Sequence, residues 1–282
     1  MNTNTQILSL RLPTAVSAGR TSKQVLARTA NAVSRFALAL LFPLALLGLW
    51  QVAHYQEWLP VQILPSPQQT WETFWDLCRS GELSANLSVS LARVAWSLAV
   101  GGAVGLAIGF AIGLSPKVKA YLYPGFEVFA QFPVIGWIPL LMLFLGIDET
   151  LKIVAISLAV LVPVVINTYK GILGIPASLL EVGQVYAFSR RQTLLRIVIP
   201  AALPSIFGGI RQGLMQAWLS LIFVELLASS EGLGYLMNWA RQVMQLDIVF
   251  AAIGVIGVIG FLLDWGLRRV ESYFDAWRLQ GL

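Results

Sequence analysis

The sequence predicts an all-α fold, a polytopic membrane helix bundle with six transmembrane helices. Of the 282 residues, 57% are hydrophobic and 12% are charged, which is about half the charged share of an ordinary soluble domain. Apolar runs of about 20 residues, the length that crosses a hydrocarbon core, recur along most of the chain. Short polar segments separate these runs. We therefore expect several membrane crossings rather than one anchor.

The chain opens with a polar segment, residues 1–35, which contains five basic residues and no acidic one. The first expected span is Phe36–Ala53, an apolar run that is too long for the core of a signal peptide and lacks a small-residue cleavage site. A non-spanning segment follows. After a turn rich in proline, the apolar residues over Gln68–Arg79 have helical spacing, and Trp71 and Trp75 are typical of headgroup depth. We expect a short interfacial helix there.

Five further spans are expected, with ends placed by the flanking polar residues: Leu87–Leu114, Tyr121–Ile147, Leu151–Tyr169, Leu203–Ala228 and Ile248–Leu267. The first of these five contains glycines at every fourth position, namely Gly101, Gly105, Gly109 and Gly113. This period places all four glycines on one face of the helix, where they allow another backbone to approach closely. The pattern favours plain helix packing, and a sliding surface in a moving bundle is the alternative.

Six spans place both termini on the same side of the membrane, and the positive-inside rule selects that side. Most of the 19 Lys and Arg residues lie in the N-terminal tail, in the loops after the second and fourth spans, or after the last span. The opposite loops are acidic instead. We therefore expect a multi-pass protein of a bacterial inner (plasma) membrane with both termini in the cytoplasm.

Several polar side chains fall within or near the expected spans, where a charge costs at least about 2.5 kcal/mol. Those nearest the ends are interpreted as snorkelling to the interface, with a functional role as the alternative: Arg93, Glu127 and Glu225. Others are predicted to line a possible translocation path or to bridge helices: Gln131, Asn167, Arg211 and Gln216.

The segment between the fourth and fifth spans, about 30 residues long, exceeds a simple helix connection. Pro176 can open a helix. Ser189 and Gln192 have the spacing of a capping box that starts a second helix, and Pro200 is expected to stop it. The turn between them presents an aromatic and basic knob suited to a groove on a soluble partner: Tyr186, Phe188, Arg190 and Arg191.

This loop resembles the cytoplasmic loop of binding-protein-dependent ABC importer permeases, written Glu-Ala-Ala, three residues, Gly, nine residues, Ile-x-Leu-Pro. Here it reads Glu181-Val182-Gly183, then Ala187 where the family has glycine, then Ile197 to Pro200. The resemblance implies a type I permease fold, in which the loop docks the ATPase through residues that include Glu181, Gly183, Tyr186, Ala187, Phe188, Arg190, Arg191 and Pro200. It also implies a permease homodimer, a cytoplasmic ATP-binding subunit and a periplasmic solute-binding protein.

The resemblance extends over about residues 63–264. Ile63 to Pro67, Leu145 to Glu149, Ile166 to Thr168 and Ala228 to Leu236 are similar to the branch of aliphatic sulfonate, taurine and nitrate permeases. It implies import of a small anionic solute, an aliphatic sulfonate first, with taurine, nitrate or another nutrient as alternatives. The expected organisation is a tail at 1–35, a first span and interfacial segment at 36–80, a permease domain at 81–268 with its coupling loop at 171–202, and a tail at 269–282.

The sequence lacks the motifs that other functional classes require. None of the five lysines follows a glycine, so no P-loop is present and any ATP hydrolysis belongs to another chain. With a lone cysteine, Cys78, and a lone histidine, His54, we expect no metal, no cofactor and no catalytic site. Basic residues form short clusters rather than a stripe, which argues against nucleic acid. An ion-coupled secondary transporter is the remaining rival, and it would be expected to show an internal repeat and paired midplane charges.

Overall fold

The computed structural model of the protein describes residues 41–280, with side chains as far as residue 271. The chain divides into two compact units at Leu59 and Pro60. In the first unit the described residues include an apolar helix, Leu41–Tyr55. The expected first span, Phe36–Ala53, therefore lies partly outside the described residues, and the basic tail at 1–35 lies wholly outside them.

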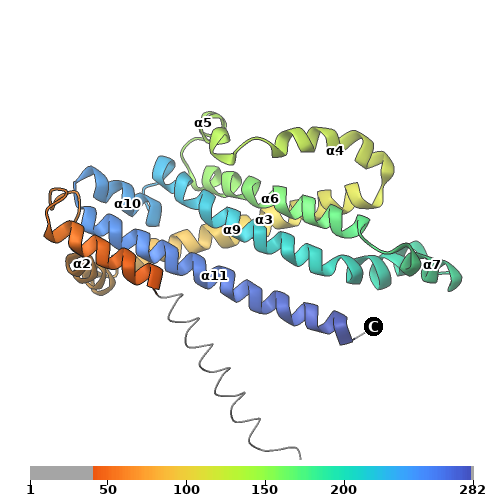
Figure 1. The fold of residues 1–282 in the computed structure, drawn as a ribbon. Coiled ribbons are helices and arrows are strands. Elements are labelled where there is room, and N and C mark those ends of the chain that lie inside the picture. Colours follow the sequence, from red (N-terminus) through yellow and green to blue (C-terminus); the bar gives the residue numbers. More distant parts are fainter. Residues whose placement is uncertain (1–40, 281–282) are drawn as a thin grey trace, which may run out of the picture. The chain divides into compact units, whose positions relative to one another are not determined.

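The second unit is built from helices, and no strand occurs within the described residues. In chain order they are α2 (Pro67–Ser80), α3 (Glu82–Leu114), α4 (Pro116–Ala130), α5 (Val134–Leu145), α6 (Glu149–Leu173), α7 (Ala177–Val185), α8 (Arg190–Thr193), the π-helical turn η1 (Leu194–Val198), α9 (Ile199–Ala228), α10 (Leu233–Gln242) and α11 (Leu246–Gln280). Figure 1 shows α3, α6, α9 and α11 running along the long direction of this unit. The predicted all-α bundle is confirmed.

Four stretches of this unit are long and apolar enough to cross a membrane, namely Glu82–Leu114, Glu149–Leu173, Arg190–Ala228 and Leu246–Glu271. The span predicted over Tyr121–Ile147 does not form one continuous helix. It is replaced by α4 and α5, which meet at a bend of 99° and count as a fifth span if taken together. The break has a local cause, because Pro133 offers no N–H and disfavours a helical conformation at the residue before it. The expected number of six spans is thus only approximately met by residues 41–280.

Helix α6 lies at the centre of the unit, between the glycine-bearing faces of α3 and α9. A Cβ atom added to Gly109 of α3 would lie 2.6 Å from Cβ of Thr168, and one added to Gly209 of α9 would lie 2.8 Å from Cβ of Asn167. Neither distance is compatible with a larger residue. The four-residue glycine period in α3 is therefore a helix-packing surface, which confirms that interpretation.

The helix predicted over Gln68–Arg79 is confirmed as α2 (Pro67–Ser80). Ser66 caps it by accepting a hydrogen bond from Gln69 N–H at 3.0 Å, and Gly81 ends it in a left-handed conformation with φ of 80°. The hydroxyl of Thr73 donates to Asp247 at the start of α11, at 2.6 Å. This contact fixes α2 across the end of the bundle that also holds α10 (Figure 1).

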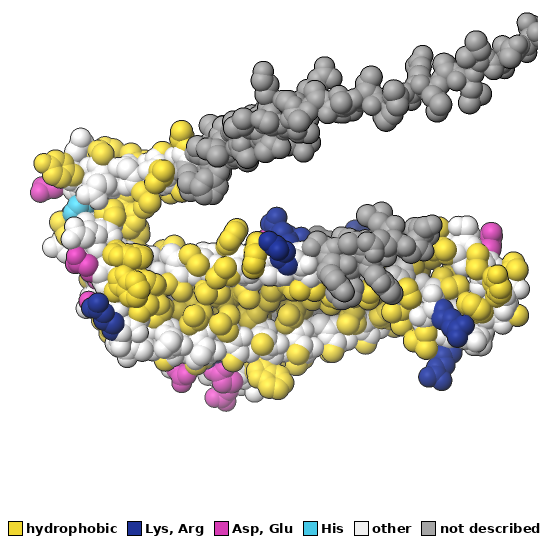
Figure 2. Space-filling view, turned by 90° about the horizontal axis from the view of Figure 1, so that it is seen from below, with side chains coloured by type: hydrophobic (Ala, Val, Ile, Leu, Met, Phe, Trp, Pro, Cys, Tyr) yellow, Lys and Arg dark blue, Asp and Glu magenta, His cyan; other side chains and the backbone are white. Residues whose placement is uncertain are grey.

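The outer surface of the described helices is largely apolar. Figure 2 shows a broad area of hydrophobic side chains across one face. Among the exposed apolar residues, Leu143 is 77% exposed and Phe144 is 74% exposed. An apolar surface of this kind would favour aggregation in water, whereas it is stable in contact with lipid tails. Together with the long apolar helices, this makes the protein a multi-pass membrane protein.

Candidate functional site

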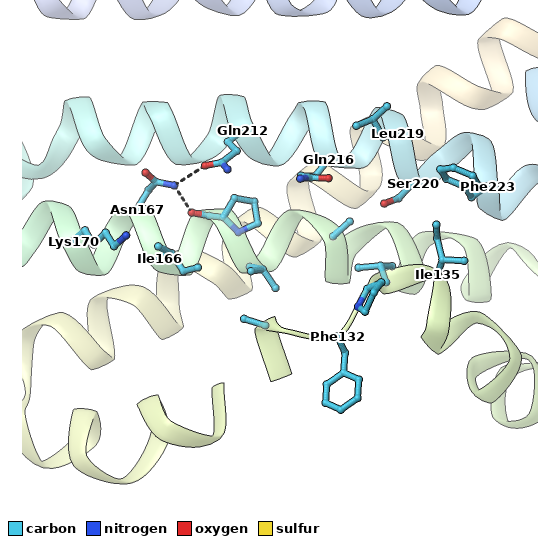
Figure 3. Close-up of a pocket in the computed structure, with 16 residues that line it drawn as sticks. Phe132, Ile135, Ile166, Asn167, Lys170, Gln212, Gln216, Leu219, Ser220 and Phe223 are labelled. Carbon is cyan, nitrogen blue, oxygen red and sulfur yellow. Dashed lines mark hydrogen bonds between the residues drawn. The ribbon is translucent and has the colours of Figure 1, made fainter. Parts of the chain in front are cut away.

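A cavity of about 620 Å³ lies between the break that joins α4 to α5, helix α6 and helix α9. Most of its lining is apolar. The polar residues that line it are Asn167, Lys170, Gln212, Gln216 and Ser220, and none of the lining residues is acidic. Figure 3 shows Lys170, Asn167 and Gln212 toward one end, and Ser220, Phe223 and Ile135 toward the other. The cavity therefore follows the long direction of α6 and α9.

One end of the cavity has an ordered amide pair. Asn167 Nδ2 donates to the carbonyl oxygen of Pro163 at 2.8 Å and to Gln212 Oε1 at 3.1 Å, and both bonds are drawn in Figure 3. In contrast, the side chains of Gln216 and Ser220 form no hydrogen bond with any described residue, although both line the cavity. Their polar atoms are thus available to a solute or to water.

The sequence identified part of this lining. Asn167 and Gln216 line the cavity, whereas Gln131 ends α4 without lining it. Arg211 turns away toward α11, where its guanidinium donates to Asp264 and to Glu271 at 2.9 Å each. Gln212, which the sequence places in the same polar cluster as Arg211 and Gln216, also lines the cavity. Sequence reasoning missed Lys170 and Ser220. The four-residue spacing of Gln212, Gln216 and Ser220 places them on one face of α9, and this signal could have found Ser220.

A second feature of functional interest is the loop from α7 to α9. The predicted capping box is present, because Ser189 Oγ accepts from Gln192 N–H at 3.3 Å and Ser189 N–H donates to Gln192 Oε1 at 2.8 Å. The expectation that Pro200 stops the second helix is wrong, since Arg190–Ala228 forms one continuous helix. The turn η1 explains this. Ile199 N–H bonds five residues back, to Leu194 O, and the wider turn accommodates the proline that follows.

The turn between α7 and α8 exposes fewer aromatic residues than expected. Tyr186 is 70% exposed and Val185 is 83% exposed, so these two form its tip. Phe188 is only half-exposed, with the Arg196 guanidinium 5.6 Å from its ring centre. Gly183 is buried, because an added Cβ would lie 2.8 Å from Ile197 Cδ1. The exposed residues of the predicted docking set are Glu181, Tyr186, Ala187, Arg190, Arg191 and Pro200.

Ala187 adopts a left-handed backbone conformation with φ of 49°. The turn therefore keeps the geometry of a glycine although it carries a Cβ atom, at a cost of about 1 kcal/mol. We expect Ala187→Gly to raise the free energy of unfolding of this loop by a similar or smaller amount, because glycine also gains entropy in the unfolded chain. Hydrogen exchange at Phe188 N–H, which bonds to Gly183 O at 2.9 Å, measures this opening. Faster exchange in the variant would contradict the expectation.

A third feature is a buried ionic cluster near the α10 end of the bundle, around Arg93 of α3. Arg93 is 3% exposed and Glu225 of α9 is fully buried. The guanidinium of Arg93 donates to Glu225 Oε1 at 2.7 Å and, through its other nitrogens, to the Glu149 carboxylate at 2.6 and 2.8 Å. Arg93 and Glu225 thus do not snorkel, and that interpretation is wrong for both. Glu127 is exposed on α4.

The same cluster holds the loop before α10 through its backbone. Gly232 N–H donates to Asn86 Oδ1 at 2.8 Å, Leu233 N–H to Ser90 Oγ at 2.9 Å, and Gly234 N–H to Glu225 Oε2 at 2.9 Å. A side chain on Gly232 would overlap the Glu225 carboxylate. The glycines of this loop are thus required for the backbone to reach buried acceptors.

Comparison with known proteins places this arrangement in a family. Residues 101–274 match the family model of the binding-protein-dependent transport system inner membrane component. This match covers α6, the cavity-lining part of α9 and the whole α7 to α9 loop. The chain belongs to this family. It is accordingly a membrane subunit of an ABC importer rather than an enzyme.

Individual members of the family are also similar to this chain. The aliphatic sulfonates transport permease protein SsuC of Bacillus subtilis (strain 168) is 39% identical over 85% of this chain and 87% of its own length. SsuC of Escherichia coli (strain K12) is 39% identical over 83% and 89%. The taurine transport system permease protein TauC of Escherichia coli (strain K12) is 34% identical over 81% and 84%.

Solved structures confirm the permease fold at low sequence identity. The MetNI methionine ABC transporter in an inward-facing conformation superimposes with a TM-score of 0.61 at 16% identity, over 70% of this chain and 97% of that one. An amino acid ABC transporter crystallised with histidines gives 0.56 at 15% identity, over 72% and 97%. At such identities the likeness concerns the fold alone.

Proposed function

We propose that this permease imports small sulfonate anions, aliphatic sulfonates first, across the inner membrane. The observation that carries the proposal is the 39% identity to two permeases named for aliphatic sulfonates, over more than four fifths of the chain. The cavity supports it chemically. Its lining combines one cation, Lys170, with three amides and a hydroxyl, and includes no carboxylate that would repel an anion.

The proposed assembly is a homodimer of this chain with two ATP-binding subunits in the cytoplasm and a solute-binding protein in the periplasm. Both termini lie in the cytoplasm in this arrangement, because the basic residues gather on that side. The loop from α7 to α9 then faces the ATPase, and α2 and α10 face the periplasm. Taurine is the second candidate solute, since the TauC relative matches most of the chain and taurine has the same sulfonate head.

The proposal is tested by growth and uptake. Deleting the gene for this permease should abolish growth on an alkanesulfonate as sole sulfur source, while growth on sulfate continues. The reason is that only the sulfonate depends on this importer. Uptake of radiolabelled alkanesulfonate should fall to background and return with the intact chain. Normal sulfonate uptake in the deletion strain, with no redundant system present, would refute the proposal. Growth lost on taurine alone would favour the second candidate.

A further inference from the structure

We propose that the first turn of α5, together with Ser220 and Gln216 of α9, forms a binding site for the sulfonate head of the solute inside the membrane. This inference rests on the proposed function and assigns one part of the cavity to one part of the solute. The site lies where the α4/α5 span is broken, so the break itself supplies the backbone groups that bind the anion.

The break leaves backbone donors at the cavity wall. Pro133 is the residue that precedes α5, and it has no side-chain oxygen to cap the helix. The N–H groups of Val134 and Ile135 consequently form no hydrogen bond with any described residue, and both residues line the cavity. A helix start with free N–H groups carries a partial positive charge and binds anions. Within lipid such groups are tolerated where they face a cavity.

An independent observation on α9 points to a ligand at the same place. Ser220 is 9% exposed, yet its hydroxyl has no partner among the described residues, and it lines the cavity. Because this hydroxyl faces the cavity from a largely buried residue and has no partner in the described part of the protein, it is left to bind a solute or water there. Figure 3 shows Ser220 toward the end of the cavity where Ile135, in the first turn of α5, lies, and Gln216 between Ser220 and Gln212 along α9. Gln216, one turn away, adds an amide that can donate.

The chemistry of this end suits a sulfonate with an alkyl chain. The sulfonate oxygens only accept hydrogen bonds, and the four groups gathered there can all donate: two backbone N–H groups, the hydroxyl of Ser220 and the amide of Gln216. Phe223, Leu219 and Ile135 provide apolar surface next to them. The single charged lining residue, Lys170, lies toward the other end of the cavity (Figure 3). The head is therefore held by hydrogen-bond donors and dipoles at this end of the cavity.

The test uses Gln216, because it is an exposed residue that lines the cavity, so replacing it removes little buried surface. The complete importer, with its ATPase and binding protein, is reconstituted in proteoliposomes, and ATP-driven uptake of radiolabelled alkanesulfonate is measured. Gln216→Glu should lower uptake by about tenfold or more, since it places a like charge against the anion. Gln216→Lys has similar length and the opposite charge, and should keep import. Ser220→Ala should raise the half-saturating sulfonate concentration about tenfold.

Gln242→Glu on α10 is the matched control, because it makes the same substitution at an exposed position outside the cavity. All variants should assemble with the ATPase and keep basal ATP hydrolysis. If Gln216→Glu imports like the wild type, or if Gln216→Lys fails equally, the anion site is refuted while the proposed function stands. If the wild-type importer takes up no alkanesulfonate, the proposed function itself fails.

Discussion

Arg93→Met is expected to destabilise the folded permease by about 3–5 kcal/mol, because it leaves the Glu225 carboxylate buried without its cation. Glu225 is fully buried, so water cannot replace the guanidinium. The substitution also removes the bond from Arg93 to the carbonyl of Glu231, 2.8 Å away, and loosens the loop before α10. The midpoint of thermal unfolding in detergent should fall by on the order of 10 °C.

A double variant separates the ion pair from general packing. In Arg93→Met with Glu225→Gln, both charges are absent, and the side-chain amide introduced on α9 can still accept from Gly234 N–H. Replacing both partners of a buried pair is often close to neutral, so this protein should recover most of the lost stability. Arg241→Met, at an exposed arginine of α10, is the control and should change little. If Arg93→Met alone unfolds at the wild-type temperature, the buried Glu225 carboxylate does not need Arg93 as its cation, which contradicts the prediction.

Tyr186→Asp is expected to separate the permease from its ATP-binding subunit. Tyr186 is 70% exposed at the tip of the loop from α7 to α9, and aromatic anchors of this kind dominate many interfaces. An aspartate at this position would place a charge in the groove of the ATP-binding subunit and reduce the binding free energy by several kcal/mol. Co-purification of the ATPase with the membrane-inserted variant should be lost, together with ATP hydrolysis stimulated by the loaded binding protein.

Tyr186→Phe is the conservative control and should assemble normally, since it keeps the ring. The same experiment at Phe188 would be less informative. Phe188 packs against Arg196 within the loop, so an aspartate there would disturb the loop as well as the interface. Normal co-purification of the ATPase with Tyr186→Asp would show that the tip of this loop is not the docking contact.

Local signals predicted the helices and caps well. The glycine period in α3 and the Ser189 capping box are properties of neighbouring residues, and both occur as expected. The effect of a proline was harder to foresee, because it depends on which hydrogen bonds the surroundings can rearrange. Pro133 breaks a predicted span, whereas Pro200 lies within a continuous helix because the π-helical turn η1 precedes it.

The partners of polar residues could not be predicted from one sequence. Arg93 and Glu225 are separated by more than a hundred residues, and only the packing of α3 against α9 brings them within 2.7 Å. Arg211 was expected at a path, but α11 offers it Asp264 and Glu271. The spacing of residues along one helix predicts which of them share a face, as for Gln212 and Gln216. It does not predict which residues of other helices pack opposite that face.

The uninterrupted helix Arg190–Ala228 joins two regions that are otherwise far apart in the molecule. Its 39 residues give a strut of roughly 58 Å at about 1.5 Å per residue. One end adjoins the proposed docking turn, and the other carries Glu225 within the buried ionic cluster. If the strut pivots at one end, a tilt of about 5° displaces the other by about 5 Å. In the proposed orientation, a small tilt imposed at the docking turn would thus displace the end of α9 near the ionic cluster by about the size of a small solute, with no unfolding in between.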